Sequence, residues 1–134
     1  MFLKETRILL VDDMLSIRDL VRSQLRTMGY TDVLEAPDGA EALRILEARK
    51  QQGAPIGLVI SDWNMPVMTG LEFLKHARAK PEYAELPIIL LTSEAEREQV
   101  TEAVLSGVSQ YIVKPFSGKT FEEKMRGAWQ KHNK

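Results

Sequence analysis

The chain has 134 residues, 44% of them hydrophobic and 28% charged, with a formal net charge of -1 at pH 7. This composition is that of one globular domain. There is no excess of basic residues that would indicate binding to nucleic acid or to a membrane surface. The absence of cysteine excludes disulfides, thiolate metal sites and cysteine nucleophiles. No apolar run reaches the ~20 residues of a membrane span, and residues 1–7 are too short and too charged for a signal peptide, so we expect a single cytoplasmic domain over residues 1–134, without an effector domain.

Short apolar runs alternate with stretches of helical periodicity along the whole chain. The predicted strands are residues 8–11, 32–36, 58–61, 88–91 and 111–113. The predicted helices follow them, with apolar stripes over residues 17–28 and 121–129, and with helical segments over 38–50, from 71 onward, and over 95–106. In the helix over 95–106 we expect Val100, Ala103 and Val104 to face inward, and the charged cluster that includes Glu96 to be a solvated face.

Strict alternation of strands and helices predicts an α/β fold with a parallel sheet and helices on both faces. The strands at 8–11, 58–61 and 88–91 are almost wholly apolar, as central parallel strands are. The strand at 32–36 is short and mixed, which favours an edge position. Right-handed crossovers then favour a doubly wound, five-stranded sheet with the strand order 2-1-3-4-5, whose switch point lies between strands 1 and 3.

Polar side chains suited to phosphoryl chemistry end four of the five strands. Asp12 and Asp13 follow the first strand, Asp62 the third, Thr92 the fourth and Lys114 the fifth. Because the carboxyl ends of parallel strands meet at one edge, we expect these side chains to form one site. Three adjacent carboxylates repel one another, and Lys114 and a divalent cation would relieve the repulsion. Mg²⁺ is favoured, because it prefers oxygen ligands and no histidine or cysteine lies near the motif.

Asp62 is the candidate nucleophile, because it ends a central strand and carboxylates can form aspartyl phosphates. The Thr92 hydroxyl and the Lys114 ammonium would each contact a phosphoryl oxygen, and backbone N–H groups after Asp62 a third. Each residue alone also has an ordinary structural explanation, since Asp13 and Thr92 are acceptable helix caps and aspartate is common after a strand. Those explanations account neither for four marked strand ends at one edge nor for a lysine ending a buried strand.

Several motifs, spread in order over nearly the whole chain, carry a resemblance to a known family. They are Val11-Asp12-Asp13, Asp38-Gly39, Ser61-Asp62-Trp63-Asn64-Met65-Pro66, Thr92 and Lys114-Pro115-Phe116. The chain resembles the receiver domain of two-component response regulators, and among these the single-domain CheY-type chemotaxis regulators. The resemblance implies a flavodoxin-like receiver fold in which Asp62 is the phosphoacceptor. Ser93 departs from it, because the chemotaxis proteins often have alanine there.

The resemblance also implies a role for each matching residue. The Mg²⁺ ligands would be Asp12, Asp13, Asp62 and the backbone carbonyl of Asn64. Thr92 and Lys114 would contact the phosphoryl group, and Tyr111 would change rotamer together with Thr92. Further implied features are a cis Lys114-Pro115 peptide, tuning of the phosphoryl lifetime by Asn64 and Glu94, and an output face that includes Tyr111 and Lys124. Trp63 is expected to be partly exposed beside the phosphoacceptor.

The leading interpretation is a stand-alone, monomeric response regulator that turns over no separate substrate. A sensor histidine kinase would phosphorylate Asp62, and the face formed by the fourth helix, fifth strand and fifth helix would then bind a downstream protein. The chemotaxis resemblance suggests a flagellar motor switch protein as this partner and a phosphatase as a further one, with no nucleic acid or membrane involved.

Three alternatives stand beside this interpretation. A phosphorelay shuttle would use the same site but pass its phosphoryl group to a histidine phosphotransfer protein. A haloacid-dehalogenase-type phosphatase is disfavoured, because its signature is Asp-x-Asp after the first strand whereas Asp12 and Asp13 are adjacent, and because the chain lacks a cap domain. A degenerate receiver that is never phosphorylated is disfavoured, because all five core residues are present.

Overall fold

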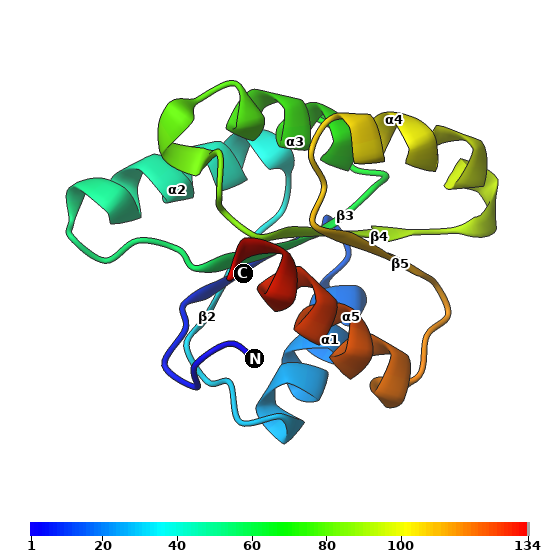
Figure 1. The fold of residues 1–134 in the computed structure, drawn as a ribbon, viewed down its shortest axis with the longest axis horizontal. Helices are drawn as coiled ribbons and strands as arrows, with labels where there is room; N and C mark the ends of the chain where they lie inside the picture. Colours follow the sequence, from blue (N-terminus) through cyan, green and yellow to red (C-terminus); the bar gives the residue numbers. More distant parts are fainter. Residues whose placement is uncertain (134) are drawn as a thin grey trace.

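The computed structural model describes residues 1–133, apart from the side chains of residues 94 and 95. Five parallel strands form one sheet in the order β2-β1-β3-β4-β5 (Figure 1). The strands are β1 (Ile8–Val11), β2 (Val33–Ala36), β3 (Leu58–Asp62), β4 (Ile88–Thr92) and β5 (Gln110–Val113). The predicted fold class and strand order are confirmed: β1 pairs with β2 on one side and with β3 on the other.

The helices cover both faces of the sheet, with α1 and α5 on one face and α2, α3 and α4 on the other (Figure 1). Their bounds are α1 (Leu15–Thr27), α2 (Gly39–Gln51), α3 (Gly70–Arg78), α4 (Val100–Leu105) and α5 (Gly118–His132), and short 3-10 helices form η1 (Pro81–Tyr83) and η2 (Glu94–Gln99). In the part of the chain that the structure describes, no helix is long and apolar enough to cross a membrane.

Two apolar layers, one on each side of the sheet, hold the fold together. Successive residues of a strand point to opposite faces. In β1, Leu9 therefore packs into the layer beneath α2 and α3, and Leu10 into the layer beneath α1 and α5. Every residue of β1, β3 and β4 is buried, which explains why these strands are apolar on both faces.

The fourth helical segment differs from the prediction of one helix over residues 95–106. The chain first forms the 3-10 helix η2 and only then the short α4. A 3-10 helix has about three residues per turn rather than 3.6, so a helical phase does not continue across Gln99. Ala103 is buried as expected, but Val104 is exposed, and the prediction that it faces inward is wrong.

The loop between β3 and α3 contains one strained residue. Val67 has a φ of 68°, and the Met68 N–H donates to the Pro66 carbonyl at 2.7 Å, so Val67 is the central residue of a tight γ-turn. A positive φ is disfavoured for a β-branched residue, because its Cβ crowds the backbone. The side chain is 80% exposed, and its packing offsets little of that strain.

We expect Val67→Asn to raise the free energy of unfolding by about 1 kcal/mol, because asparagine adopts positive φ more readily than valine. Urea unfolding of the two proteins would measure the difference. Val67→Thr is the matched control, since threonine is also β-branched and keeps the strain. An equal gain from both substitutions would contradict the backbone explanation and point instead to the loss of exposed apolar surface.

Candidate functional site

The four strand ends named in the sequence meet at one edge of the sheet. Asp12 directly follows β1, Asp62 is the last residue of β3, Thr92 the last of β4, and Lys114 follows β5. Asp12, Asp62 and Thr92 are buried, whereas Asp13 is exposed. Asp12, Asp13 and Asp62 each offer a carboxylate oxygen, and these oxygens all lie within 4.8 Å of one another. The parallel register therefore turns separated sequence positions into one cluster.

Asp12 is a buried carboxyl group whose charged form is disfavoured in the folded protein. Its burial, together with the nearby charges of Asp62 and Asp13, raises its pKa from 3.8 to about 6, against the lowering effect of the Met14 backbone N–H and of Lys114. The Met14 N–H donates to its Oδ1 at 2.9 Å. Its Oδ2 is buried and, among the described residues, has no hydrogen-bond partner. A buried carboxylate oxygen without a partner is a position that a cation would satisfy.

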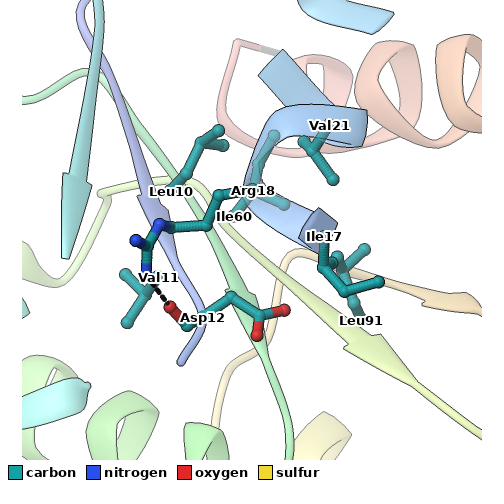
Figure 2. Close-up of a pocket in the computed structure, with 8 residues that line it drawn as sticks. All are labelled: Leu10, Val11, Asp12, Ile17, Arg18, Val21, Ile60 and Leu91. Carbon is teal, nitrogen blue, oxygen red and sulfur yellow. Dashed lines mark hydrogen bonds between the residues drawn. The ribbon is translucent and has the colours of Figure 1, made fainter. Parts of the chain in front are cut away.

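The backbone at Asp12 is held from the other side by an arginine that the sequence analysis did not single out. Figure 2 shows the Arg18 guanidinium at the Asp12 backbone carbonyl, while the Asp12 carboxylate points away from it; the Nη1–O distance is 2.5 Å. Arg18 Nε also donates to Glu35 on β2 at 2.7 Å. Burial raises the pKa of Glu35, but hydrogen bonds from Arg18 and Arg22 outweigh it and leave that pKa below its ordinary value. Arg18 thus ties α1, β1 and β2 together beneath the site.

Lys114 pairs with the candidate phosphoacceptor. Its Nζ donates to Asp62 Oδ1 at 2.7 Å, and its backbone N–H donates to the Thr92 carbonyl at 2.7 Å. The Lys114-Pro115 peptide bond is cis. The backbone hydrogen bond to Thr92 holds Lys114 at the end of β5. Among the described residues, its side chain is the ammonium group that pairs with the Asp62 carboxylate.

Three further predicted residues, Thr92, Tyr111 and Lys124, extend from the site to α5. Thr92 donates its hydroxyl to the Ser93 carbonyl at 3.2 Å, and it lines one pocket together with Tyr111. Lys124 on α5 places its Nζ 4.9 Å from the centre of the Tyr111 ring. The structure thus connects Thr92, Tyr111 and Lys124 from the site to the α4–β5–α5 side. The Glu94 side chain lies outside the described residues.

Two expectations about neighbouring residues are wrong. Trp63 is only 3% exposed and packs in the apolar layer beneath α2 and α3, rather than being partly exposed. Glu96 is 7% exposed rather than solvated. Its carboxylate accepts a hydrogen bond from Asn64 Nδ2 at 2.9 Å and another from the Ser93 hydroxyl. The expectation of a solvated face rested on the charge of Glu96. Its spacing did carry a signal, because Glu96 precedes Val100 and Ala103 by four and seven residues and so shares their face of an α-helical period.

The arrangement can hold a hard divalent cation and carry out phosphoryl chemistry. Three carboxylates form an all-oxygen donor set, which suits Mg²⁺ and suits zinc or copper poorly. Asp12 Oδ2, which is buried and has no hydrogen-bond partner in the described part of the chain, supports the same assignment. Beside it, the Asp62 carboxylate and the Lys114 ammonium provide a nucleophile and a group that balances charge.

Comparisons with known proteins point to one family. Residues 8–126 match the family model of the response regulator receiver domain. Chemotaxis protein CheY-3 of Vibrio cholerae is 43% identical over 122 residues, which cover 91% of this chain and 90% of that protein. Chemotaxis protein CheY of Pseudomonas aeruginosa is 37% identical over 127 residues, which cover 95% of this chain and 98% of that protein.

Solved structures give the same result. The chemotaxis response regulator CheY4 of Vibrio cholerae is 40% identical, with a TM-score of 0.78 over 92% of this chain and 98% of that one. The receiver domain of a sensor histidine kinase from Pseudomonas aeruginosa PAO1 is 26% identical, with a TM-score of 0.78 over 93% of this chain and 98% of that one. That receiver domain has a magnesium ion coordinated in its active site cleft.

Proposed function

Because this chain belongs to the family of response regulator receiver domains, we propose that it is a phosphorylation-controlled switch in chemotaxis signalling. Asp62 accepts a phosphoryl group from a sensor histidine kinase, and a downstream protein then binds the altered α4–β5–α5 face. The observation that carries this proposal is the strand-end cluster: carboxylate oxygens of Asp12, Asp13 and Asp62 lie within 4.8 Å of one another, and the Lys114 ammonium donates to Asp62 Oδ1 at 2.7 Å.

The proposed metal ligands are the carboxylates of Asp12, Asp13 and Asp62 and the backbone carbonyl of Asn64. Mg²⁺ bound there would neutralise negative charge on the carboxylates and on the phosphoryl group during transfer. Asp12 Oδ2, for which the described residues supply no hydrogen-bond partner, supports Asp12 as a ligand. The magnesium ion in the related receiver domain from Pseudomonas aeruginosa supports Mg²⁺ as the cation.

In the proposed transfer, an Asp62 carboxylate oxygen attacks the phosphorus of a phosphohistidine. The phosphorus–nitrogen bond breaks, its electron pair stays on the imidazole, and an acyl phosphate forms on Asp62. Lys114 now bonds Asp62 Oδ1 and would move with the developing charge onto a phosphoryl oxygen. The Thr92 hydroxyl, which bonds its own chain at Ser93 in the resting form, would turn to another phosphoryl oxygen.

The proposed output runs from Thr92 to the surface. Thr92 and Tyr111 line one pocket, so a shift of the Thr92 side chain changes the space available to the Tyr111 ring. Val104 and Leu105 on α4 are 51% and 82% exposed, and a partner would cover such apolar side chains. Phosphorylation would shift a pre-existing equilibrium between two arrangements of this face, and the partner would read the difference.

A phosphorylation assay tests the input half of the proposal. Wild-type protein incubated with acetyl phosphate and Mg²⁺ is expected to gain one phosphoryl group by intact mass, on the peptide that contains Asp62. Asp62→Asn and wild type with EDTA are expected to gain none, because the first lacks the nucleophile and the second lacks the cation. Labelling of Asp62→Asn to the same extent as wild type would contradict the assignment of the phosphoacceptor.

A binding experiment tests the output half. Protein activated with beryllofluoride and Mg²⁺ is used to capture partners, with Asp62→Asn treated in the same way as the control. Recovery of a flagellar motor switch protein by the activated wild type alone is the expected result. Recovery of a histidine phosphotransfer protein without any motor component would contradict the chemotaxis role and favour a phosphorelay shuttle.

A further inference from the structure

We infer that Glu96 is a positioning residue that fixes the Asn64 side chain for the water that removes the phosphoryl group from Asp62, which rests on the proposed function. Glu96 lies in η2 after β4, and Asn64 lies in the loop after β3. The two loops flank the same edge of the sheet, and the 2.9 Å bond between Asn64 Nδ2 and Glu96 Oε1 joins them across that edge.

The Glu96 carboxylate is itself held in place. Its second oxygen accepts the hydroxyl proton of Ser93, which directly follows the phosphoryl-contacting Thr92. Only 7% of Glu96 is exposed, which is unusual for a glutamate and indicates a group retained by its hydrogen bonds. Ser93 and Asn64 are therefore the two hydrogen-bond donors that orient this buried carboxylate, and each comes from a loop at the site.

The chemistry of the partner fixes which way the Asn64 amide faces. A carboxylate accepts hydrogen bonds and donates none, so the amide must present its NH₂ group to Glu96. The amide oxygen, Oδ1, is then directed away from Glu96. An Asn64 side chain without this bond is free to rotate, because the residue is otherwise exposed. Glu96 thus selects one of the two amide orientations.

In this inference the Asn64 amide oxygen orients the water that hydrolyses the acyl phosphate. A water oxygen attacks phosphorus opposite the bond to Asp62, that phosphorus–oxygen bond breaks, and its electron pair returns to the Asp62 carboxylate. One water proton passes to a phosphoryl oxygen, which gives dihydrogen phosphate. Asn64 lies two residues after Asp62 at the exposed mouth of the site, so its Oδ1 can accept a hydrogen bond from the attacking water and orient it.

The test is the rate at which phosphorylated protein loses its phosphoryl group once acetyl phosphate has been removed, with Mg²⁺ present. Glu96→Ala is expected to slow this loss roughly 2- to 10-fold, as for the loss of one positioned hydrogen bond. Glu96→Gln is expected to stay close to wild type, because its amide oxygen still accepts from Asn64. Glu98→Ala removes an exposed acidic residue from the same 3-10 helix and is the matched control, expected to change nothing.

A double-mutant cycle separates positioning from general damage. In an Asn64→Ala background, Glu96→Ala is expected to have no further effect on the rate, because nothing remains for it to position. Equal slowing with and without Asn64, or an unchanged rate in Glu96→Ala itself, would overturn the role of Glu96. A wild-type protein that never gains a phosphoryl group would instead overturn the proposed function, and the role of Glu96 with it.

Discussion

Replacing Asp12 by asparagine is expected to stabilise the metal-free protein at neutral pH while abolishing its phosphorylation. Asp12 is 3% exposed, and its pKa in the folded protein is raised to about 6 from 3.8. The folded state therefore binds the Asp12 proton more tightly than the unfolded state does. The stabilisation from this proton is complete below pH 3.8 and is lost as the pH rises through about 6.

Above that pH, the ionised Asp12 opposes folding by up to roughly 3 kcal/mol. Asparagine carries no charge, and its side-chain oxygen still accepts the hydrogen bond that the Met14 N–H donates to Asp12 Oδ1 at 2.9 Å. Asp12→Asn is therefore expected to raise the free energy of unfolding by about 1–3 kcal/mol at pH 7.5 without Mg²⁺. The same change removes one proposed metal ligand, so the protein gains stability where it loses function.

Urea unfolding at several pH values, with and without Mg²⁺, measures this effect. The advantage of Asp12→Asn over wild type is expected to shrink as the pH falls from 7.5 toward 4, because Asp12 in the folded protein becomes protonated as the pH falls through about 6. Mg²⁺ is expected to stabilise wild type and leave Asp12→Asn unchanged. Asp13→Asn is the control: it removes an exposed carboxylate, so it should impair Mg²⁺ binding with a smaller gain in stability. A lower free energy of unfolding for Asp12→Asn than for wild type at pH 7.5 would contradict the conclusion that the ionised Asp12 opposes folding.

The parts of the site that the sequence predicts correctly follow from the periodicity of a parallel sheet. Alternating apolar runs and helices determine which chain ends share an edge, so residues as distant as Asp12 and Lys114 can be assigned to one cluster before any coordinates exist. The prediction depends only on which residue ends each strand. The strand order and the carboxylate cluster belong to this class.

The features of the site that the sequence does not predict depend on contacts that form only in the folded chain. Glu96 was expected to be solvated because it is charged, whereas its carboxylate accepts hydrogen bonds from Asn64 and Ser93. Val104 is exposed although it lies within α4 beside the buried Ala103. Arg18 has an ordinary helical position, and its hold on the Asp12 carbonyl requires the packing of α1 against β1 and β2. Each of these contacts joins segments whose relative placement comes from tertiary structure.

The second large expected effect concerns Gly70, the first residue of α3. A Cβ placed on Gly70 would lie 2.3 Å from the backbone oxygen of Asp62 and 3.1 Å from the Cα of Trp63. The Gly70 N–H also donates to the Trp63 carbonyl at 2.8 Å, which holds the helix start against the end of β3. Since backbone atoms block the added methyl group, Gly70→Ala must displace the segment that carries the phosphoacceptor.

We expect Gly70→Ala to lower the free energy of unfolding by about 1–3 kcal/mol, the range for overpacking a rigid site. Its rate of phosphorylation by acetyl phosphate should also fall, because the Asp62 carboxylate moves relative to Asp12 and Lys114. Gly118→Ala is the matched control, since Gly118 is likewise the first residue of its helix, α5, and follows the capping Ser117. Its added Cβ would meet only the end of the flexible Gln24 side chain, at 3.1 Å.

The two glycines separate damage to folding from displacement of the site. Gly118→Ala is expected to leave stability within a few tenths of a kcal/mol of wild type and to leave phosphorylation unchanged. Phosphorylation of Gly70→Ala is measured at a temperature where both variants are fully folded, so that slow labelling reports the position of Asp62 rather than the unfolded fraction. Normal labelling of a folded Gly70→Ala would mean that the site tolerates movement of β3, and that its geometry is set by Lys114 and the bound cation instead.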